Sequence, residues 1–337
     1  MGEITRVQWE PEQPAETIVT RLERVAASVP DNVAVRSGER SLSYRALLEK
    51  ARHVASGLVG TGQPGDPVAL VFGHDCDTLV AIVGALMAGR PYVVLDPAVP
   101  EARHRHVLDD LGRCAVLTQH RHMHLAAALA GPGTPLLTFE DLTVSPVVEL
   151  PHIEPDDVAG IFYTSGTSGE PKGVVWTHRL MLHRIMLDAV PGRFGPDDVF
   201  SLLYSCSFGT SINDIFGPLL NGGSTVLWDV TGAGVGALAD WLEDEGITVL
   251  HAQASLLRKI LELMEPTRSY PRLRMVIPSG RIYRSDLARL FKHLPDDALV
   301  VSRYASTEAF LVSRLYIDRH SQFEDGALPV GTPVGDK

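Results

Sequence analysis

The stretch IFYTSGTSGEPKGVVWTH, residues 161–178, places a cluster of Thr, Ser and Gly residues between two short apolar runs. Gly166, Gly169 and Gly173 let the backbone approach a ligand closely, and successive backbone N–H groups in such a loop form a nest for an anion. Lys172 adds a cation near the end of the loop. This composition is typical either of a phosphate-binding loop or of a solvated Gly/Ser turn, and the run of hydroxyl residues favours phosphate.

Two common phosphate motifs are excluded by the order of residues. A Walker A loop ends in Gly-Lys-Ser/Thr, whereas here Pro171 precedes Lys172 and Gly173 follows it. A Rossmann fingerprint needs the spacing G-x-G-x-x-G, which GTSGEPKG does not have. The sequence therefore predicts a different class of nucleotide site.

Helix-like and strand-like segments alternate along the chain on both sides of this loop. Residues 41–60 carry apolar side chains at helical spacing, and the short apolar run at 66–72 predicts a buried strand. Further strands are expected at residues 90–97, 114–119, 158–165, 199–205, 224–229, 247–252, 273–280 and 298–306, with helices between them. Such alternation predicts an α/β fold of mostly parallel sheets flanked by helices.

A proline-rich joint suggests where the chain divides. The segment LTVSPVVELPHIEPDD, residues 142–157, contains three prolines and is the most loop-like connection in the sequence. We therefore expect two tandem α/β subdomains, the first at residues 1–148 and the second at residues 149–337, which holds the phosphate loop.

Composition excludes several classes of partner. A net charge of −11 argues against a nucleic-acid partner, because phosphate backbones require a basic face. No apolar run is long enough to span a bilayer and the first residues lack an apolar signal region, so we expect a cytoplasmic protein without a membrane partner. Three widely spaced cysteines in apolar surroundings predict buried, reduced thiols.

The stretch YTSGTSGEPKGVVWTH resembles, nearly residue for residue, the phosphate-loop signature of the adenylate-forming superfamily. This superfamily includes adenylation domains of nonribosomal peptide synthetases, acyl- and aryl-CoA synthetases and luciferases. Other family landmarks follow in the same order: LSYRALLEKARHVASGL, ALMAGRPYVVLDPAVP, FGTSINDIFGPLLNGGSTVL and SRYASTEA. The segment PYVVLDPAVPEARHRHVLDDLG is most similar to peptide-synthetase adenylation domains, and the resemblance covers essentially the whole chain.

The resemblance implies an AMP-forming acid–thiol ligase. Such an enzyme activates a carboxylic acid with ATP and Mg²⁺, releases pyrophosphate and leaves an acyl-adenylate, and positioning and charge neutralisation carry most of the catalysis. A carrier-protein phosphopantetheine thiol would then accept the acyl group. A CoA ligase is the alternative within the enzyme class, and a catalytically silent adenylate-binding scaffold is the alternative outside it.

The resemblance also implies roles for individual residues. Thr307 would contact the α-phosphate and act in catalysis with Lys172, and Glu308 would hold Mg²⁺ through its carboxylate oxygens. The residues expected to grip the β- and γ-phosphates are Thr164, Ser165, Gly166, Thr167, Ser168, Gly169 and Lys172. Those expected around adenine are Gly280, Arg281, Ser302 and Tyr304. Those expected to line the substrate pocket are Phe208, Gly209, Thr210, Asn213, Ser279 and Arg303.

One departure from the family concerns the acid. Amino-acid-activating members carry Asp directly after the Phe of FGTS, and it pairs with the substrate's α-ammonium, whereas this chain has Gly209 there. A buried ammonium without its counter-charge would lose several kcal/mol. We therefore predict an acid without an α-amino group, with Asp214 as an alternative partner for an amine placed elsewhere on the acid.

Two arginines and one alanine also depart from the family pattern. Arg281 stands where members usually have Glu, and Arg303 where they have a small or apolar residue. These arginines either face solvent and pair with acids such as Asp286, or meet a second carboxylate or polar group on the substrate. Ala305 replaces a Gly in the segment 304–308, which puts the geometry of that turn in question.

The resemblance finally implies that the chain is a truncated N-terminal core. It ends at PVGTPVGDK, before the family's ribose-binding Asp and before the small C-terminal lid domain with its catalytic lysine. We therefore expect the chain alone to be weakly active or inactive, and the missing lid domain to act as a partner.

Overall fold

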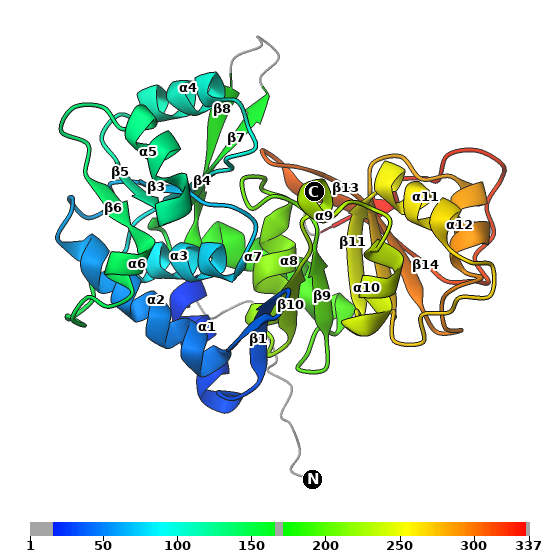
Figure 1. Cartoon of the computed structure of the whole chain (residues 1–337). Helices are drawn as coiled ribbons and strands as arrows, with labels where there is room; N and C mark the ends of the chain where they lie inside the picture. The colour runs from blue at the N-terminus through cyan, green and yellow to red at the C-terminus, as the bar shows by residue number, and fades with distance from the viewer. Residues whose placement is uncertain (1–15, 166–170, 335–337) are drawn as a thin grey trace.

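The computed structural model describes residues 16–165 and 171–334, whose strands form two sheets. Figure 1 shows the two sheets side by side, each with helices packed against it. The strand order is β6-β5-β3-β4-β7-β8 in the smaller sheet and β15-β14-β13-β12-β11-β9-β10-β1-β2 in the larger one. Most neighbouring strands run parallel, as the alternation of apolar runs and helices predicts.

The smaller sheet is covered on both faces. Its central strands are wholly buried, which explains why they are continuous apolar runs rather than alternating patterns. Its strands are β3 (Val68–Val71), β4 (Tyr92–Leu95), β5 (Ala115–Thr118), β6 (Leu136–Thr138), β7 (Val158–Ser165) and β8 (Pro171–Thr177). The helices around it are α2 (Tyr44–Val59), α3 (Cys76–Met87), α4 (Glu101–Leu111), α5 (Met123–Leu129) and α6 (Phe139–Leu142), with a 3₁₀ turn at His120–His122.

The larger sheet gathers strands from both ends of the chain. They are β1 (Val33–Ser37), β2 (Arg40–Ser43), β9 (Val199–Leu202), β10 (Ser224–Leu227), β11 (Val249–Gln253), β12 (Met275–Ser279), β13 (Leu299–Ser306), β14 (Phe310–Ile317) and β15 (Thr332–Pro333). The remaining helices are α1 (Ile18–Ser28), α7 (His178–Gly192), α8 (Ser211–Leu219), α9 (Val230–Ala233), α10 (Leu238–Asp244), α11 (Ala254–Leu263) and α12 (Arg284–Leu290).

The two sheets exchange strands across the expected subdomain boundary. β1 and β2, from the first part of the chain, belong to the larger sheet, and β1 pairs with β10 in parallel. β7 and β8 follow residue 148 but belong to the smaller sheet, where β7 pairs with β4. The line between the sheets therefore does not fall between residues 148 and 149, and the division into subdomains there stays a prediction.

Helices α7 and α8 pack against each other between the sheets and form the centre of the molecule (Figure 1). α7 begins after Thr177, whose hydroxyl accepts a hydrogen bond from the Leu180 N–H at 3.2 Å. Every residue of α8 is buried, including the polar side chains of Asn213 and Asp214. Buried polar side chains require partners, so the chemistry of these two helices is set by what surrounds them.

The last hairpin, the cysteines and the hydropathy of the helices complete the description of the fold. β13 and β14 form an antiparallel hairpin whose turn covers residues 307–309, and β14 has no counterpart among the expected elements. The three cysteines are buried and free, as expected. None of the helices in residues 16–165 and 171–334 has the length and hydropathy that a membrane span requires.

Candidate active site

Two hairpins, one from each sheet, meet at the expected phosphate end of the site. The Thr164 hydroxyl, near the end of β7, donates a hydrogen bond to the Glu308 carboxylate at 3.2 Å. Lys172 lies opposite Thr164 in the β7–β8 pairing and is exposed. The structure therefore brings Thr164 and Lys172 to the same end of the site as Glu308, which lies more than 130 positions further along the sequence.

The structure describes the expected phosphate loop in part. Gly166, Thr167, Ser168 and Gly169 lie outside the described residues, and Ser165 is described only as the last residue of β7, opposite Pro171. The loop joins the ends of two paired strands, which agrees with the expectation that it follows a strand.

The Thr307–Glu308 turn is held from behind by a buried tryptophan. The Trp176 indole N–H donates a hydrogen bond to the Thr307 carbonyl at 3.1 Å, and the Ser306 hydroxyl accepts one from the Ala309 N–H at 3.0 Å. The Glu308 backbone N–H and the Thr164 hydroxyl lower the pKa of the exposed Glu308 carboxyl. This carboxylate is thus ionised and open to solvent, as a ligand for a hard cation must be.

The turn does not need a glycine at position 305. Among the non-glycine residues that the structure describes, only Arg193 and Phe310 have positive φ, so Ala305 is in an ordinary conformation. The pairing between β13 and β14 shifts its register between Tyr304 and Ala305 instead. The replacement of Gly by Ala therefore leaves the turn intact.

The residues expected around adenine lie at the ends of neighbouring strands. Gly280 follows β12 with φ of +92°, a conformation that favours glycine. Ser302 is buried on β13, whereas the Tyr304 ring is 58% exposed and free to stack on a planar group. Arg281 is exposed, and the Asp286 carboxylate is bound by Arg258 at 2.9 Å.

The residues expected in the substrate pocket begin beside Thr307. A Cβ atom on Gly209 would lie 3.4 Å from Thr307 Cγ2 and 3.4 Å from Trp176 Cη2, which is ordinary contact. Phe208 before it is half-exposed, and Thr210 after it precedes the first residue of α8. The position that carries Asp in amino-acid-activating relatives is therefore adjacent to the turn expected to hold the α-phosphate.

Asp188 of α7 is the hub of a buried ionic network. Its carboxylate forms an ion pair with Arg303, another with Arg314 at 3.3 Å, and accepts a hydrogen bond from Asn213 Nδ2 at 3.0 Å. All four side chains are largely or fully removed from solvent. Arg303 is thus neither exposed nor unpaired, and it connects β13 to the helices in the centre of the molecule.

A second network joins Asp214, His251 and Ser279. His251 Nδ1 lies 2.7 Å and 2.9 Å from the Asp214 oxygens, and Nε2 lies 2.9 Å from Ser279 Oγ. The Arg303 guanidinium, which can only donate, lies 3.3 Å from the same Nε2. The Nε2 atom therefore carries the lone pair and Nδ1 the proton. Burial raises the pKa of Asp214, and the neighbouring His251 opposes that shift.

This order of side chains is that of a Ser–His–Asp triad, but Arg303 changes its chemistry. A general base must take a proton on Nε2. A guanidinium that donates to that same atom opposes the arrival of a second positive charge there. The network is therefore better suited to holding a polar group in place than to activating Ser279 as a nucleophile.

Several buried polar atoms around these networks have no hydrogen-bond partner among the described residues. They are Nε and Nη1 of Arg184, Oδ1 of Asn213 and the hydroxyl of Tyr204. The Arg184 guanidinium lies over the Trp176 ring, 5.2 Å from its centroid, and burial lowers the pKa of Arg184 to about 10. Arg184 is thus a buried, charged and incompletely bonded side chain beside the expected substrate pocket.

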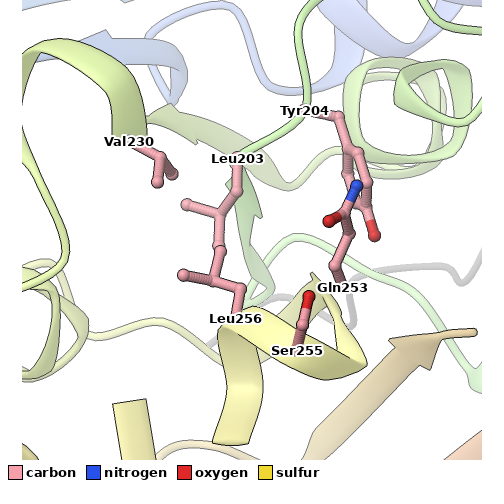
Figure 2. Close-up of a pocket in the computed structure, with 6 residues that line it drawn as sticks. All are labelled: Leu203, Tyr204, Val230, Gln253, Ser255 and Leu256. Carbon is pink, nitrogen blue, oxygen red and sulfur yellow. The ribbon is translucent and has the colours of Figure 1, made fainter. Parts of the chain in front are cut away.

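A cavity of about 400 Å³ opens next to the His251 network. It lies at the carboxyl ends of β9 and β11, where open α/β sheets place ligands. The ring of Tyr204, one of its walls, packs against His251 with centroids 4.8 Å apart. Figure 2 shows the six side chains that line the cavity, which are Leu203, Tyr204, Val230, Gln253, Ser255 and Leu256.

The sequence motifs gave no role to Arg184, Asp188, His251 or Tyr204. The sequence carries one weak signal: Arg184 and Asp188 of α7 are four residues apart and therefore lie on one face of the helix. His251 interrupts an apolar strand in the same way. Only the folded chain shows that these charges converge on Arg303 and Asp214.

Known proteins similar to this chain include much longer peptide synthases. Tyrocidine synthase 3 of Brevibacillus parabrevis is 29% identical over 326 residues, which is 95% of this chain and 5% of the relative. Isonitrile lipopeptide synthase of Mycobacterium tuberculosis is 36% identical over 219 residues, 64% of this chain and 8% of the relative. The chain thus spans a small part of the curated relatives it matches.

Solved structures agree with the fold. The nonribosomal peptide synthetase FmoA3 in its α-methyl-L-serine-AMP bound form has a TM-score of 0.86 at 28% identity, covering 98% of this chain and 37% of that one. The N-terminal subdomain of Klebsiella oxytoca NpsA has a TM-score of 0.82 at 22% identity, covering 95% and 82%. A family model described as AMP-binding enzyme matches residues 22–336, and the chain therefore belongs to the AMP-binding enzyme family.

Proposed function

We propose that this protein activates a carboxylic acid with ATP, forming an acyl-adenylate and releasing pyrophosphate. Membership of the AMP-binding enzyme family supports ATP as the co-substrate. The convergence of Thr164 and Glu308 at a 3.2 Å hydrogen bond supports a phosphate and metal site between the two hairpins. In this proposal the acid's carboxylate attacks the α-phosphorus beside Thr307, and pyrophosphate leaves toward the β7–β8 loop.

The phosphate end neutralises charge. Lys172 and the residues of the loop hold the β- and γ-phosphates, and Thr307 orients the α-phosphate. Glu308 fits a Mg²⁺ ion because its carboxylate is exposed, ionised and already oriented by the Thr164 hydroxyl. When bound, Mg²⁺ offsets the negative charge that develops on the phosphate oxygens. The exposed Tyr304 ring provides a stacking surface for adenine.

The observation that carries the substrate proposal is Gly209. Its φ is not in the left-handed region and a Cβ would fit there at 3.4 Å, so nothing in the backbone requires glycine. The absence of a carboxylate at position 209 is therefore explained by the chemistry of the ligand rather than by a requirement of the backbone. The nearby carboxylates are already engaged, Asp188 by two arginines and Asp214 by His251. An α-ammonium group on the substrate would therefore find no free carboxylate among these described groups. We infer that the acid has no α-ammonium group.

The same contacts argue against Asp214 as the partner of an amine elsewhere on the acid. Both Asp214 oxygens lie within hydrogen-bonding distance of His251 Nδ1, and the side chain is only 1% exposed. An amine would have to displace His251 to reach it. We infer that Asp214 orients His251 rather than binding substrate.

We further propose that the acyl group passes to the phosphopantetheine thiol of a carrier protein. The similar curated proteins are peptide synthases several times longer than this chain, which supports a carrier protein rather than CoA as the acceptor. A C-terminal lid domain, supplied within a longer chain or by a partner, would complete the site.

The test is ATP–pyrophosphate exchange across an acid panel, with a lid domain supplied. Exchange with aryl, hydroxy, keto or dicarboxylic acids and none with the standard α-amino acids is the expected result. Robust exchange with a standard α-amino acid would overturn the substrate proposal. Silence with every acid, together with failure to bind ATP, would overturn adenylation itself. A competition experiment, in which carrier protein and CoA are both offered to the enzyme-bound acyl-adenylate, then identifies the acceptor.

A further inference from the structure

The buried polar atoms without partners near the expected substrate pocket are mainly hydrogen-bond donors. Arg184 offers Nε–H and Nη1–H groups that no described residue accepts, and the buried Tyr204 hydroxyl makes no hydrogen bond of normal geometry. Buried donors without acceptors are rare in folded proteins because each costs free energy. Two such donors on the one buried guanidinium of Arg184 indicate a ligand that brings oxygen acceptors.

The ionic groups in the same region do not balance. Three arginines, Arg184, Arg303 and Arg314, face two aspartates, Asp188 and Asp214. Asp188 is shared by Arg303 and Arg314, and Asp214 is occupied by His251. Arg184 is therefore the cation without an ion pair among the described residues. The Asp188 charge opposes the lowering of its pKa, but the groups that lie against its guanidinium are the rings of Trp176 and Phe310.

Arg184 is connected to the reacting end of the site through one side chain. Its guanidinium lies over Trp176, whose ring edge would touch a Cβ on Gly209 at 3.4 Å and whose N–H holds the Thr307 carbonyl. An acid whose carboxylate reacts beside Thr307 would thus pass Gly209 with its α-carbon. The next polar group of the acid would approach Arg184, at the side of the pocket where amino-acid-activating relatives carry a negative charge.

We propose that the acid carries a second carboxylate and that Arg184 binds it. The protein would then present a positive charge to the substrate where amino-acid-activating relatives present a negative one. This inference rests on the proposed adenylation of a carboxylic acid and narrows it to dicarboxylic acids. A planar guanidinium is the side chain best matched to a carboxylate, which it binds through two parallel hydrogen bonds. Arg303, which the sequence also offers for this role, is committed to Asp188.

The test uses stable acyl-adenylate analogues and the 337-residue chain, so that it does not depend on turnover. Two sulfamoyl adenosines are compared by calorimetry: one carries a succinyl group, the other its uncharged succinamyl isostere. The succinyl compound is expected to bind about 10-fold more tightly or better, because an ionic bidentate pair is lost in the isostere. Equal affinity for the two compounds would overturn the inference.

Variants assign the preference to a residue. Arg184→Met removes the guanidinium but keeps an unbranched apolar side chain at this position, and it is expected to bring the succinyl-to-succinamyl ratio close to one. Arg179→Met removes an exposed arginine of the same helix, whose partner is Asp156, and is expected to leave the ratio unchanged. A ratio that survives in Arg184→Met would show that Arg184 is only a stacked structural cation. The wild-type comparison stands even if that variant fails to fold.

The outcomes separate this inference from the proposed function. If the chain binds ATP and both analogues with equal strength, adenylation stands and the dicarboxylic preference is wrong. If it binds neither analogue nor ATP, the proposed function itself is wrong.

Discussion

The nucleotide end and the acid end of this site differ in how they are built. At the nucleotide end, Lys172, Tyr304 and Glu308 are exposed and lie on two hairpins, one from each sheet. At the acid end, the side chains of Asp188, Asp214, His251 and Arg303 are largely removed from solvent and bonded to one another across four elements, and the buried Arg184 lies on the same helix as Asp188. The groups at the first end are open to a ligand, whereas the charges at the second lie inside the fold, where we propose that they determine which acid binds.

The difference predicts that substitutions at the two ends will have different signatures. Changes at the acid end should alter stability as well as binding, because buried charges cannot lose a partner without cost. Changes at the nucleotide end should alter binding alone, because exposed side chains are solvated in either state. Four substitutions test this contrast.

The largest effect is expected from Asp188→Asn. The substitution leaves Arg303 and Arg314 buried without their shared counter-charge, which should lower the free energy of unfolding by about 3–5 kcal/mol. Denaturant unfolding measures the loss. Asp156→Asn, which removes an exposed carboxylate paired with Arg179, is the matched control and should leave stability unchanged. A small effect at Asp188 would show that the acid end is not a cohesive core.

A pH dependence of stability is expected from His178, the buried first residue of α7. Burial lowers its pKa to about 4, so between this value and its ordinary value the unfolded chain binds the extra proton. The stabilising effect of the neutral ring is complete above the ordinary pKa and is lost as pH falls through that window, about 2 kcal/mol between pH 7 and pH 5.

Unfolding curves of the His178→Gln variant should lack that part of the pH dependence. His152→Gln, which alters an exposed histidine, should retain it. Identical pH profiles for His178→Gln and the wild type would mean that the ring is already accessible to solvent and that the start of α7 is not part of the core.

Gly209→Asp tests the polarity of the acid subsite. The backbone accepts a side chain there, and the new carboxylate would lie near the Trp176 ring that Arg184 covers. We expect binding of a dicarboxylic adenylate analogue to weaken by about 10-fold, with a gain for an analogue bearing an α-ammonium group. Calorimetry on both analogues measures the exchange of preference, and unchanged preferences would contradict the role given to Gly209.

The smallest effect on the fold is expected from Glu308→Gln. The side chain is exposed, so the unfolding transition should not move, whereas affinity for MgATP should fall several-fold because a carboxylate ligand for Mg²⁺ is lost. Titrations with and without Mg²⁺ isolate the metal contribution. A metal-independent loss would assign Glu308 to orienting Thr164 rather than to binding the cation.

The same contrast explains what the sequence could predict. The fold class followed from apolar runs such as β3 and β4, which are wholly buried, and from helices with clear periodicity. The nucleotide end is written in short contiguous motifs around Lys172 and Glu308, so it could be located before the fold was known. The exchange of β1–β2 and β7–β8 between the sheets could not be predicted, because pairing between strands far apart in the sequence leaves no local pattern.

The acid end was only partly predictable for the same physical reason. Gly209 and Arg303 stood out because they depart from a family pattern. The residues around them, Arg184, Asp188 and His251, could not be recognised from the sequence. The contacts that place Asp188 and His251 in the site join residues 37 to 126 positions apart. One interpretation offered for Arg303, that it faces solvent, is wrong: its side chain is 9% exposed and paired with Asp188.

The central claim is that this chain forms the adenylate of an acid without an α-amino group. The most direct measurement is mass spectrometry of the adenylate retained after incubation with ATP, a lid domain and a mixed pool of acids. The account predicts a species whose mass equals AMP joined to a dicarboxylic or other non-amino acid. An adenylate of a standard α-amino acid would contradict it.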